Sequence, residues 1–361
     1  MQQALVRHRQ TGRQTDEKAM KPRLDIHFTA TQKRAFWKGT AYVPVQEEFL
    51  VNHARNGIML ALQSLRLPKG SPVGVMVYNC HTVFSAVAQA GYKPVFIDVT
   101  DALTLDLADL REKAKGLRAL VVTHLFGIIN DIACIREEFP DLQIIEDCAH
   151  AFGHHGADGD FCVFSIGQGK LPSLGDGGIL TVQNEALLSE VERLYRDLPE
   201  YSFRENLKLY CKLSVQSLLY WPWVYSLITK PLKQWRKVSS GVETLCPSKM
   251  SPGIRAMFAV AKASFDDCIQ ERKLRAAQTE SSLCNVPGVR RVLSGSINGF
   301  MAIAECEDPS AVKEVLRKQG LEAETHFGHC IEWAKQFGYV EGSCPQAERL
   351  TQHLLMVPTY A

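Results

Sequence analysis

The most informative part of the chain is residues 144–182, IIEDCAHAFGHHGADGDFCVFSIGQGKLPSLGDGGILTV. A short apolar run ends in two adjacent acids, Glu146 and Asp147, and His150 follows them. A second apolar run, 161–166, leads into a glycine-rich turn that carries one lysine, Lys170. Short apolar runs bounded by glycine-rich segments are typical of buried strands. The stretch therefore predicts neighbouring sheet strands with an acid and a lysine near their ends.

Asp147 and Lys170 together have the chemistry of a pyridoxal phosphate (PLP) site. A lysine among small, uncharged neighbours loses proton affinity and becomes the amine nucleophile that a Schiff-base link requires. A carboxylate at the end of a central strand can keep the cofactor's ring nitrogen protonated. Taken singly, Lys170 reads more simply as a surface lysine, Asp147 as a helix N-cap and His150 as a core histidine. The ordered set favours a cofactor site.

Apolar strands alternate with helices along the first half of the chain. The pattern predicts helices at 54–65, 82–90, 105–114 and 130–138, and strands at 72–78, 94–99, 118–123, 143–147, 161–166 and 178–182. Such alternation predicts an α/β fold in three layers, a mainly parallel sheet covered by helices on both faces. Ligands bind these sheets at the carboxyl ends of the strands, where Asp147 and the turn bearing Lys170 fall.

Several motifs together resemble the DegT/DnrJ/EryC1/StrS family of PLP-dependent sugar aminotransferases, which have fold type I. The matching segments are EDCAHAFG (146–153), Ser165 to Lys170, GDGG (175–178), KPVFIDV (93–99), THLFG (123–127) and the long helical run 251–278. The resemblance extends from about residue 49 to residue 360. It implies a PLP-binding large domain at 29–245 and a smaller α+β domain at 246–361.

The resemblance assigns roles to the matching residues. Lys170 is the expected catalytic residue, which bonds the cofactor and then moves a proton, and Asp147 pairs with the ring nitrogen. His150 matches a residue that hydrogen-bonds the phenolic oxygen, and Ser165 matches a phosphate-binding hydroxyl. The helix start at 54–65 resembles a phosphate-binding one, which suits a dianion. The expected cofactor contacts are therefore Arg55, Asn56, Cys80, His81, Asp147, His150, Ser165 and Lys170.

Three departures from the family's pattern bear on specificity. Cys80 stands where the family often has a ring-stacking aromatic residue, with Tyr78 and His81 nearby, and the identity of the stacking residue stays open. Pro247 stands near the position of an asparagine that some members send to the partner subunit's phosphate. The chain stops at LLMVPTYA (354–361), without the family's usual final helix.

Composition indicates a globular, cytoplasmic protein. The chain has 361 residues, 46% of them hydrophobic, and a net charge of +2, which does not indicate nucleic-acid binding. The 11 cysteines show no paired spacing and predict buried free thiols rather than disulfides or a zinc site. Residues 1–28 lack the apolar core of a secretory signal and predict a flexible basic lead-in.

Residues 207–237, LKLYCKLSVQSLLYWPWVYSLITKPLKQWRK, form an unusual apolar insertion. No charged residue lies between Lys212 and Lys230, and Pro222 interrupts a run that is short for a bilayer span. Three interpretations compete. The first, which we favour, is that the segment packs on the smaller domain or on a dimer partner. The second is that it is an interfacial membrane anchor. The third is that it is a lid over the substrate entrance.

The resemblance implies a homodimeric aminotransferase with active sites near the subunit interface. Its amino donor is expected to be glutamate and its acceptor a keto sugar on a nucleoside diphosphate, in the synthesis of amino sugars for polysaccharides or for a secondary metabolite. Two alternatives stay open. One is a degenerate member of the family that acts as a binding or regulatory protein. The other is a fold-type I PLP lyase that releases its product without transferring nitrogen.

Overall fold

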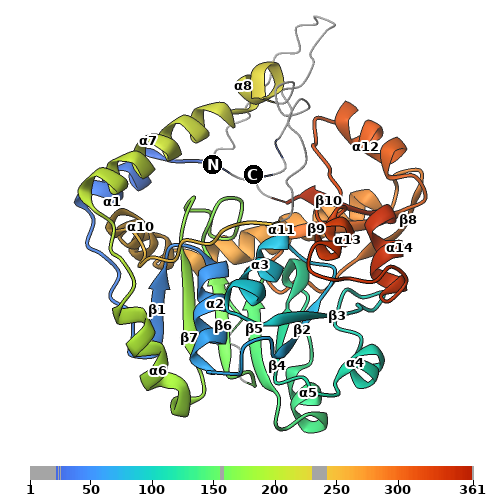
Figure 1. Ribbon diagram of the computed structural model, residues 1–361. Helices are drawn as coiled ribbons and strands as arrows, with labels where there is room; N and C mark the ends of the chain where they lie inside the picture. The colour runs from blue at the N-terminus through green and yellow to red at the C-terminus, as the bar shows by residue number, and fades with distance from the viewer. Residues whose placement is uncertain (1–21, 23, 25, 155–157, 230–241, 360–361) are drawn as a thin grey trace, which may run out of the picture.

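The computed structural model describes residues 22, 24, 26–154, 158–229 and 242–359. Seven strands form the central sheet (Figure 1) in the order β1-β7-β6-β5-β4-β2-β3. Their bounds are β1 Glu48–Val51, β2 Pro72–Met76, β3 Lys93–Ile97, β4 Ala119–Thr123, β5 Gln143–Cys148, β6 Phe161–Ser165 and β7 Gly178–Val182.

The sheet is mainly parallel, as the sequence predicts, with an antiparallel edge. Strands β2 to β6 pair in parallel, whereas β7 runs antiparallel to β6, and β1 runs antiparallel to β7. The interior strands are buried on both faces; all five residues of β4 are buried. Parallel strands need such cover because helices cross over both faces of the sheet.

Helices form the two outer layers. On one face α2 (Ala54–Ser64) packs against α3 (His81–Gln89) and α6 (Glu185–Arg196). Right-handed crossovers place α4 (Leu107–Lys113) and α5 (Ile132–Glu138) on the other face. Acidic and amide side chains start α4, α5 and α6, because they accept hydrogen bonds from unpaired N–H groups of the first turn. The capping residues are Asp106, Asp131 and Asn184.

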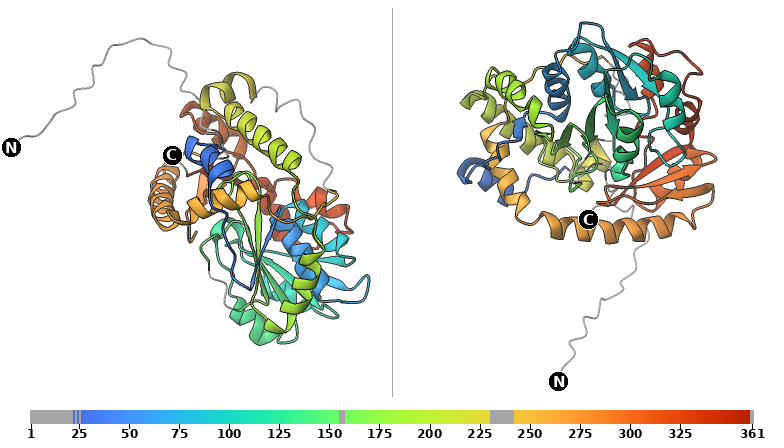
Figure 2. Two further views of the ribbon diagram at one scale, coloured as in Figure 1. Left: turned by 90° about the vertical axis from the view of Figure 1, so that its left-hand side faces the viewer. Right: turned by 90° about the horizontal axis from the view of Figure 1, so that it is seen from below.

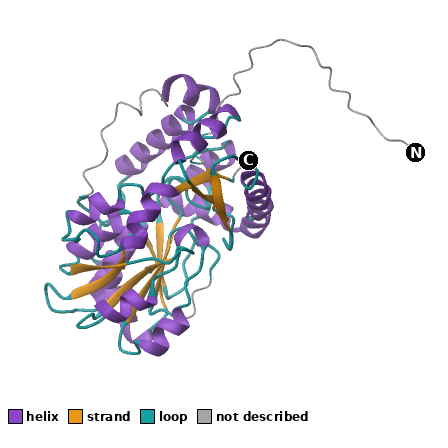
Figure 3. Ribbon diagram, turned by 90° about the vertical axis from the view of Figure 1, so that its right-hand side faces the viewer, coloured by secondary structure: helices purple, strands orange, loops and turns teal. Residues whose placement is uncertain are grey.

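A second, smaller sheet follows in the chain, and Figure 3 shows the two groups of strands apart from each other. Its three antiparallel strands have the order β10-β9-β8. The elements of this part are β8 Val289–Leu293, β9 Met301–Cys306, α12 Pro309–Lys318, α13 Cys330–Lys335, α14 Pro345–His353 and β10 Leu354–Pro358. The observed architecture is thus α/β with a smaller sheet-containing part, which confirms the predicted fold class.

The predicted long helix at 251–278 is two helices, α10 (Pro252–Lys262) and α11 (Phe265–Leu283). Ser264 has φ −120° and ψ 18°, outside the helical region, and its N–H turns back to the Ala261 carbonyl. The prediction of one continuous helix is therefore wrong. A short apolar run gives no warning of such a break, because both halves keep the helical spacing.

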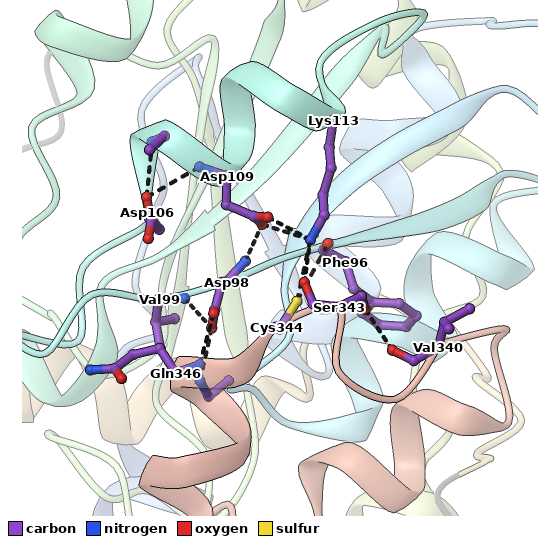
Figure 4. A network of polar contacts seen from close by, with 12 residues as sticks. Phe96, Asp98, Val99, Asp106, Asp109, Lys113, Val340, Ser343, Cys344 and Gln346 are labelled. Atoms are coloured by element: carbon purple, nitrogen blue, oxygen red, sulfur yellow. Dashed lines mark hydrogen bonds and ion pairs between the residues drawn. The ribbon is translucent and has the colours of Figure 1, made fainter.

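Buried polar contacts join the smaller part to the large sheet (Figure 4). Asp98, directly after β3, accepts hydrogen bonds from the Gln346 and Ala347 amides at 2.9 and 2.8 Å, at the start of α14. Its own N–H donates to Asp109 on α4 at 2.7 Å. Lys113 donates to Asp109 and, at 2.8 Å, to the Ser343 carbonyl. The two hydrogen bonds to Asp98 satisfy amides of the first turn of α14 that would otherwise be unpaired.

The apolar insertion begins with α7 (Phe203–Leu219) and continues through α8 (Pro222–Val224) and the π-helical turn η2 (Tyr225–Thr229). Figures 1 and 2 show α7 and α8 along one outer edge of the molecule. The buried face of α7 packs on α10 and on α1 (Ala30–Lys38). Tyr225 is buried and donates to Glu322 of the smaller part. Residues 230–237 of the insertion lie outside the described residues.

Most of the predicted lead-in at 1–28 lies outside the described residues. Its last part is packed: Ile26 and Phe28 are buried, and the Phe28 ring meets that of Tyr210 on α7 at 5.3 Å. All 11 cysteines are free thiols, as expected. The expectation that they are buried holds for Cys148, Cys162, Cys306, Cys330 and Cys344 and is wrong for Cys134, Cys211, Cys246, Cys268 and Cys284, which are exposed.

Candidate active site

A cavity of about 340 Å³ opens at the carboxyl ends of the parallel strands. Its walls come from segments far apart in the chain, including the starts of α2 and α3, the end of β5, the β6–β7 turn and α7. Six of the eight expected cofactor contacts line this one cavity: Arg55, Cys80, Asp147, His150, Ser165 and Lys170. The structure therefore brings together the acid and the lysine that the sequence singles out.

Asp147 is held rigidly at the cavity wall. It is 3% exposed, and its carboxylate accepts hydrogen bonds from the Thr123 hydroxyl at 3.1 Å and the Ala149 amide at 3.0 Å. Asn79 donates in turn to Thr123 at 2.7 Å. Burial raises the pKa of Asp147, and these hydrogen bonds with the nearby Lys170 charge offset only part of that rise. A further cation placed in the cavity would therefore stabilise the charged form of this buried carboxylate.

Lys170 occupies the glycine-rich turn between β6 and β7. Its N–H bonds back to the Gly167 carbonyl at 3.2 Å, and Gly169 has φ +70°, a conformation that favours glycine. The ammonium lies 5.8 Å from the centre of the Phe300 ring, which comes from the smaller part of the chain. The tight turn thus aims the lysine inward at the cavity instead of leaving it on a solvated loop.

His150 is a neutral donor at the same wall. The Phe126 amide donates to its Nδ1 at 3.2 Å, which leaves the proton on Nε2. Burial lowers the pKa of His150 well below its usual range, and the Lys170 charge lowers it further. The ring stacks between Phe126 and Phe300, at 5.3 and 4.7 Å. Phe126 has φ +56°, a strained backbone that directs its N–H at His150.

The start of α2 forms the other end of the cavity. Arg55, in its first turn, and Ser165, the last residue of β6, both line the cavity there. His53, the N-cap residue, also lines it and lies 2.7 Å from Asp176. Arg55 pairs with Glu243 at 2.9 Å. A helix N-terminus with an arginine and a hydroxyl suits a phosphate group.

The GDGG segment (175–178) is needed because β7 passes very close to α2. A Cβ atom added to Gly178 would lie 2.4 Å from the backbone nitrogen of Ala54. Gly177 has φ +110°, which strains any side-chain-bearing residue. These glycines therefore let the helix start approach the sheet and bring Arg55 to the cavity.

Asn56 and His81, the other two expected contacts, are not among the residues that line the cavity. The Asn56 amide N–H bonds to the His53 carbonyl, and its buried side chain donates to Asn52. The helical turn directs it away from the cavity. His81 lies 3.7 Å from Glu243, and its ring meets Trp333 at 4.8 Å.

Cys80 lines the cavity beside the expected ring position. Burial raises the pKa of its thiol, but His81 and the Thr82 hydroxyl, 3.1 Å away, more than offset this and lower it overall. Tyr78 is 1% exposed and packs edge-on against Phe327, so it does not reach the cavity. Phe327 itself lines the cavity, which makes it the aromatic alternative to Cys80 for contact with a ring.

Sequence reasoning missed most of the other lining residues, among them His53, Asn79, Thr123, Lys212 and Phe327. Thr123 opens the THLFG segment, and His53 directly precedes the expected phosphate-binding helix. Both could therefore have been predicted as site residues from the sequence. Asn79 and Phe327 carried none, because they reach the site only through folding. Lys212 places α7 in the cavity wall, in line with the interpretation of the insertion as a lid.

A second polar cluster lies behind the cavity, on the opposite face of β5. Atoms of His124, Glu146 and His154 lie within 4.8 Å of one another, as a metal site requires. The Asn130 amide, however, donates to His124 Nδ1 at 3.1 Å, which leaves the proton on Nε2, facing Glu146 at 2.9 Å. A metal-binding histidine instead donates its second N–H to an acceptor. The cluster is therefore a hydrogen-bonded network.

Comparisons with known proteins agree with this geometry. Residues 33–201 match the model of the DegT/DnrJ/EryC1/StrS aminotransferase family. A GDP-perosamine synthase of Vibrio cholerae is 25% identical over 184 residues, 45% of this chain and 50% of that protein. A dTDP-3-amino-3,4,6-trideoxy-alpha-D-glucose transaminase of Micromonospora megalomicea subsp. nigra is 31% identical over 166 residues, 43% of each chain. The chain spans about half the length of these relatives.

Solved structures extend the likeness to the whole fold. The putative sugar aminotransferase Spr1654 from Streptococcus pneumoniae, in its PLP-form, matches with a TM-score of 0.72 at 16% identity, covering 95% of this chain and 94% of its own. DesV of S. venezuelae matches with a TM-score of 0.69 at 22% identity, covering 94% and 93%. Residues 33–201, which carry Asp147, His150 and Lys170, are thus similar in sequence to the DegT/DnrJ/EryC1/StrS aminotransferase family, and these solved structures share the fold of the whole chain.

Proposed function

We propose that this protein is a PLP-dependent aminotransferase that transfers an amino group from glutamate to a keto sugar carried on a nucleoside diphosphate. The observation that carries the proposal is that Lys170, Asp147 and His150 line one cavity of about 340 Å³. The names of the relatives, which act on GDP- and dTDP-linked sugars, support the substrate class. Amino-sugar synthesis is the process that such a reaction serves.

The residues present fit PLP. Asp147 is a buried acid with a raised pKa. A cation beside it, such as a protonated ring nitrogen, stabilises its charged form. At the other end, Arg55, Ser165 and the start of α2 suit the phosphate group. His150 carries its proton on Nε2 and can donate to an oxygen between these two ends. PLP, when bound, supplies an aldehyde for an amine and a ring that withdraws electrons.

Each residue then has a defined task. Lys170 holds the cofactor aldehyde through its amine and afterwards moves a proton at the substrate carbon. Asp147 keeps a proton on the ring nitrogen, and the Thr123 hydroxyl and Ala149 amide fix the angle of its carboxylate. The buried ring of Phe300 lies beside the lysine and gives its ammonium an apolar neighbour.

Two finer statements belong to the same proposal. We propose a homodimer, because the family resemblance places active sites near a subunit interface. We also propose that the protein works in the cytoplasm, in keeping with its 11 free cysteines. Size measurement by light scattering tests the first, and cell fractionation tests the second.

The decisive experiment compares wild type with Lys170→Ala after addition of PLP. Wild type is expected to show the visible absorbance of lysine-bound cofactor and to lose it on addition of glutamate, with release of 2-oxoglutarate. Lys170→Ala is expected to stay folded and lack that absorbance, whereas the exposed-site control Lys69→Ala resembles wild type. A colourless wild type favours a binding protein. A bound cofactor that does not respond to glutamate favours the lyase.

A further inference from the structure

Exposed apolar side chains gather on α7, α8 and η2. Of the fifteen large hydrophobic residues exposed in the described part of the chain, eight lie between residues 203 and 228. We name these eight the α7–α8 apolar surface: Phe203, Leu207, Val215, Leu218, Trp221, Trp223, Leu227 and Ile228. Both tryptophans are 60% exposed and Leu227 is 74% exposed. Clusters of this kind on a folded protein mark an interaction site.

The apolar stripe on α7 is not needed to hold the helix in place. Phe203, Leu207 and Val215 are spaced by multiples of four residues, which puts them on one face of the helix. The opposite face already packs on the protein through Leu209 and Leu213, both buried. The exposed stripe is thus a second apolar face on a helix that is already anchored.

The end of the insertion is held in a defined position with its tryptophans outward. Tyr225 is fully buried and donates to Glu322 of the smaller part of the chain. The Thr229 hydroxyl donates to the Leu219 carbonyl at 2.6 Å and closes the turn. Trp221 and Trp223 flank Pro222 on the solvent side of this anchored turn. The surface is therefore built into the fold.

Basic residues border the apolar stripe. Arg204, Lys208 and Lys212 are also spaced four apart and all three are exposed; Arg204 and Lys208 directly follow the stripe residues Phe203 and Leu207. The sequence then continues with Lys230, Lys233, Arg236 and Lys237. Between residues 203 and 237 stand seven basic residues and one acid, Glu205, against a net charge of +2 for the whole chain. Positive charge is thus concentrated in the same segment of the sequence as the exposed apolar side chains.

We propose that the α7–α8 apolar surface binds the surface of an anionic lipid bilayer. Apolar side chains enter the headgroup region, tryptophans lie at the interface, and neighbouring lysines and arginines pair with anionic lipids. Among the described helices, none combines the length and apolarity needed to cross a bilayer, so this contact is peripheral. Lys212 belongs to both the basic row and the wall of the candidate active site, so the bound membrane lies beside that cavity.

Charge favours a bilayer over a second copy of the chain. A two-fold contact brings the same surface of both protomers together. It would place two rows of Arg204, Lys208 and Lys212 near each other, with Glu205 and Glu200 as the exposed acids beside each row. Anionic lipid headgroups complement the same charges. The apolar stripe and its basic border are together what an interfacial helix requires.

Co-sedimentation of the full chain with vesicles tests the proposal. Vesicles of phosphatidylcholine with phosphatidylglycerol are expected to pellet the protein, phosphatidylcholine alone much less, and added salt weakens the binding. The double variant Trp221→Ser/Trp223→Ser is expected to bind about tenfold or more weakly. Its control, Leu274→Ser/Val340→Ser, removes apolar residues that are also exposed but lie elsewhere, and is expected to bind as wild type does.

The basic border has its own pair of variants. Arg204→Gln/Lys208→Gln is expected to lower binding to anionic vesicles severalfold, whereas Lys69→Gln/Lys115→Gln, also at exposed sites, leaves it unchanged. Unchanged sedimentation of the tryptophan variant overturns the proposal. So does light scattering in which that variant becomes a smaller species while no form of the protein binds vesicles, because the surface is then a contact between copies. None of these measurements depends on aminotransferase activity.

Discussion

The two faces of β5 at its carboxyl end hold adjacent acids in opposite situations. Glu146 points to the closed face, where His124 at 2.9 Å, His154 at 3.3 Å and the Gly159 amide at 2.9 Å surround its carboxylate. Asp147 points to the cavity. Burial alone would raise the pKa of Glu146, but these hydrogen bonds outweigh it and lower the pKa to about 2. For Asp147, burial prevails and the pKa is raised.

The opposite pKa shifts distinguish an acid that stabilises the fold, Glu146, from an acid placed to bind a cationic ligand, Asp147. Successive residues of a strand face opposite sides, so one backbone segment can supply both. Glu146 is satisfied by the folded chain itself. Asp147 receives only a hydroxyl and one amide, and its charge is completed by whatever cation enters the cavity. Each acid therefore has a different expected response to substitution.

The largest expected effect is the loss of activity in Asp147→Asn. Asparagine keeps the shape but cannot hold a proton on a ring nitrogen, so we expect kcat to fall about 10²- to 10³-fold, as when one preorganised electrostatic contact is removed. In the cofactor-free protein the same change should leave the free energy of unfolding unchanged or slightly higher, because it removes a poorly stabilised acid. Steady-state kinetics and urea unfolding measure the two effects. A clear loss of stability would contradict the contrast with Glu146.

Glu146→Gln is expected to do the reverse. The amide NH₂ of glutamine faces hydrogen-bond donors, which leaves buried groups unsatisfied, so we expect the free energy of unfolding to fall by about 2–3 kcal/mol at pH 7. Activity per folded molecule should stay within about threefold of wild type, because the side chain does not reach the cavity. Urea unfolding and kinetics at matched folded concentrations test this. A stable but inactive Glu146→Gln protein would place Glu146 in the catalytic machinery.

The same acid predicts how stability depends on pH. Because folding lowers the pKa of Glu146 from its ordinary 4.5 to about 2, its contribution is complete above about pH 5 and disappears as the pH falls through about 2. At full strength this is about 3 kcal/mol, since one pKa unit corresponds to about 1.4 kcal/mol. The stability gap between wild type and Glu146→Gln should therefore shrink between pH 5 and pH 3. A gap independent of pH would assign the effect to packing.

The large sheet could be predicted well because its strands are buried on both faces. The expected strand at 143–147 is β5, Gln143–Cys148, and the expected strand at 178–182 is β7. β1 was not predicted, because four residues at an antiparallel edge give little periodic signal. In the insertion, an uncharged sequence does not reveal which apolar residues the fold buries and which it exposes.

The reactive groups of the cavity could be predicted from the sequence, but the hydrogen bonds that hold them in place could not. Asp147 and Lys170 follow from residue type and position at the ends of strands. The hydrogen bonds that hold Asp147 do not, because Asn79 and Thr123 stand 44 residues apart, and Thr123 and Asp147 stand 24 apart. Helical geometry also separates neighbours in sequence, since the Asn56 side chain bonds to Asn52 while Arg55 lines the cavity.

The smallest expected effect concerns a third acid, Asp98, at the end of β3, whose carboxylate receives the first amides of α14. Asp98→Ala removes this cap, and we expect the free energy of unfolding to fall by about 1–2 kcal/mol. Asp98→Asn is expected to lose a similar amount, because both carboxylate oxygens accept backbone N–H groups and the asparagine NH₂ would face one of these donors. Urea unfolding of both variants at pH 7 makes the comparison. Asp98→Ala is expected to lower the free energy of unfolding less than Glu146→Gln does. An equal loss would mean that a helix cap and a closed acid network stabilise the fold alike, against the contrast drawn between different kinds of buried acid.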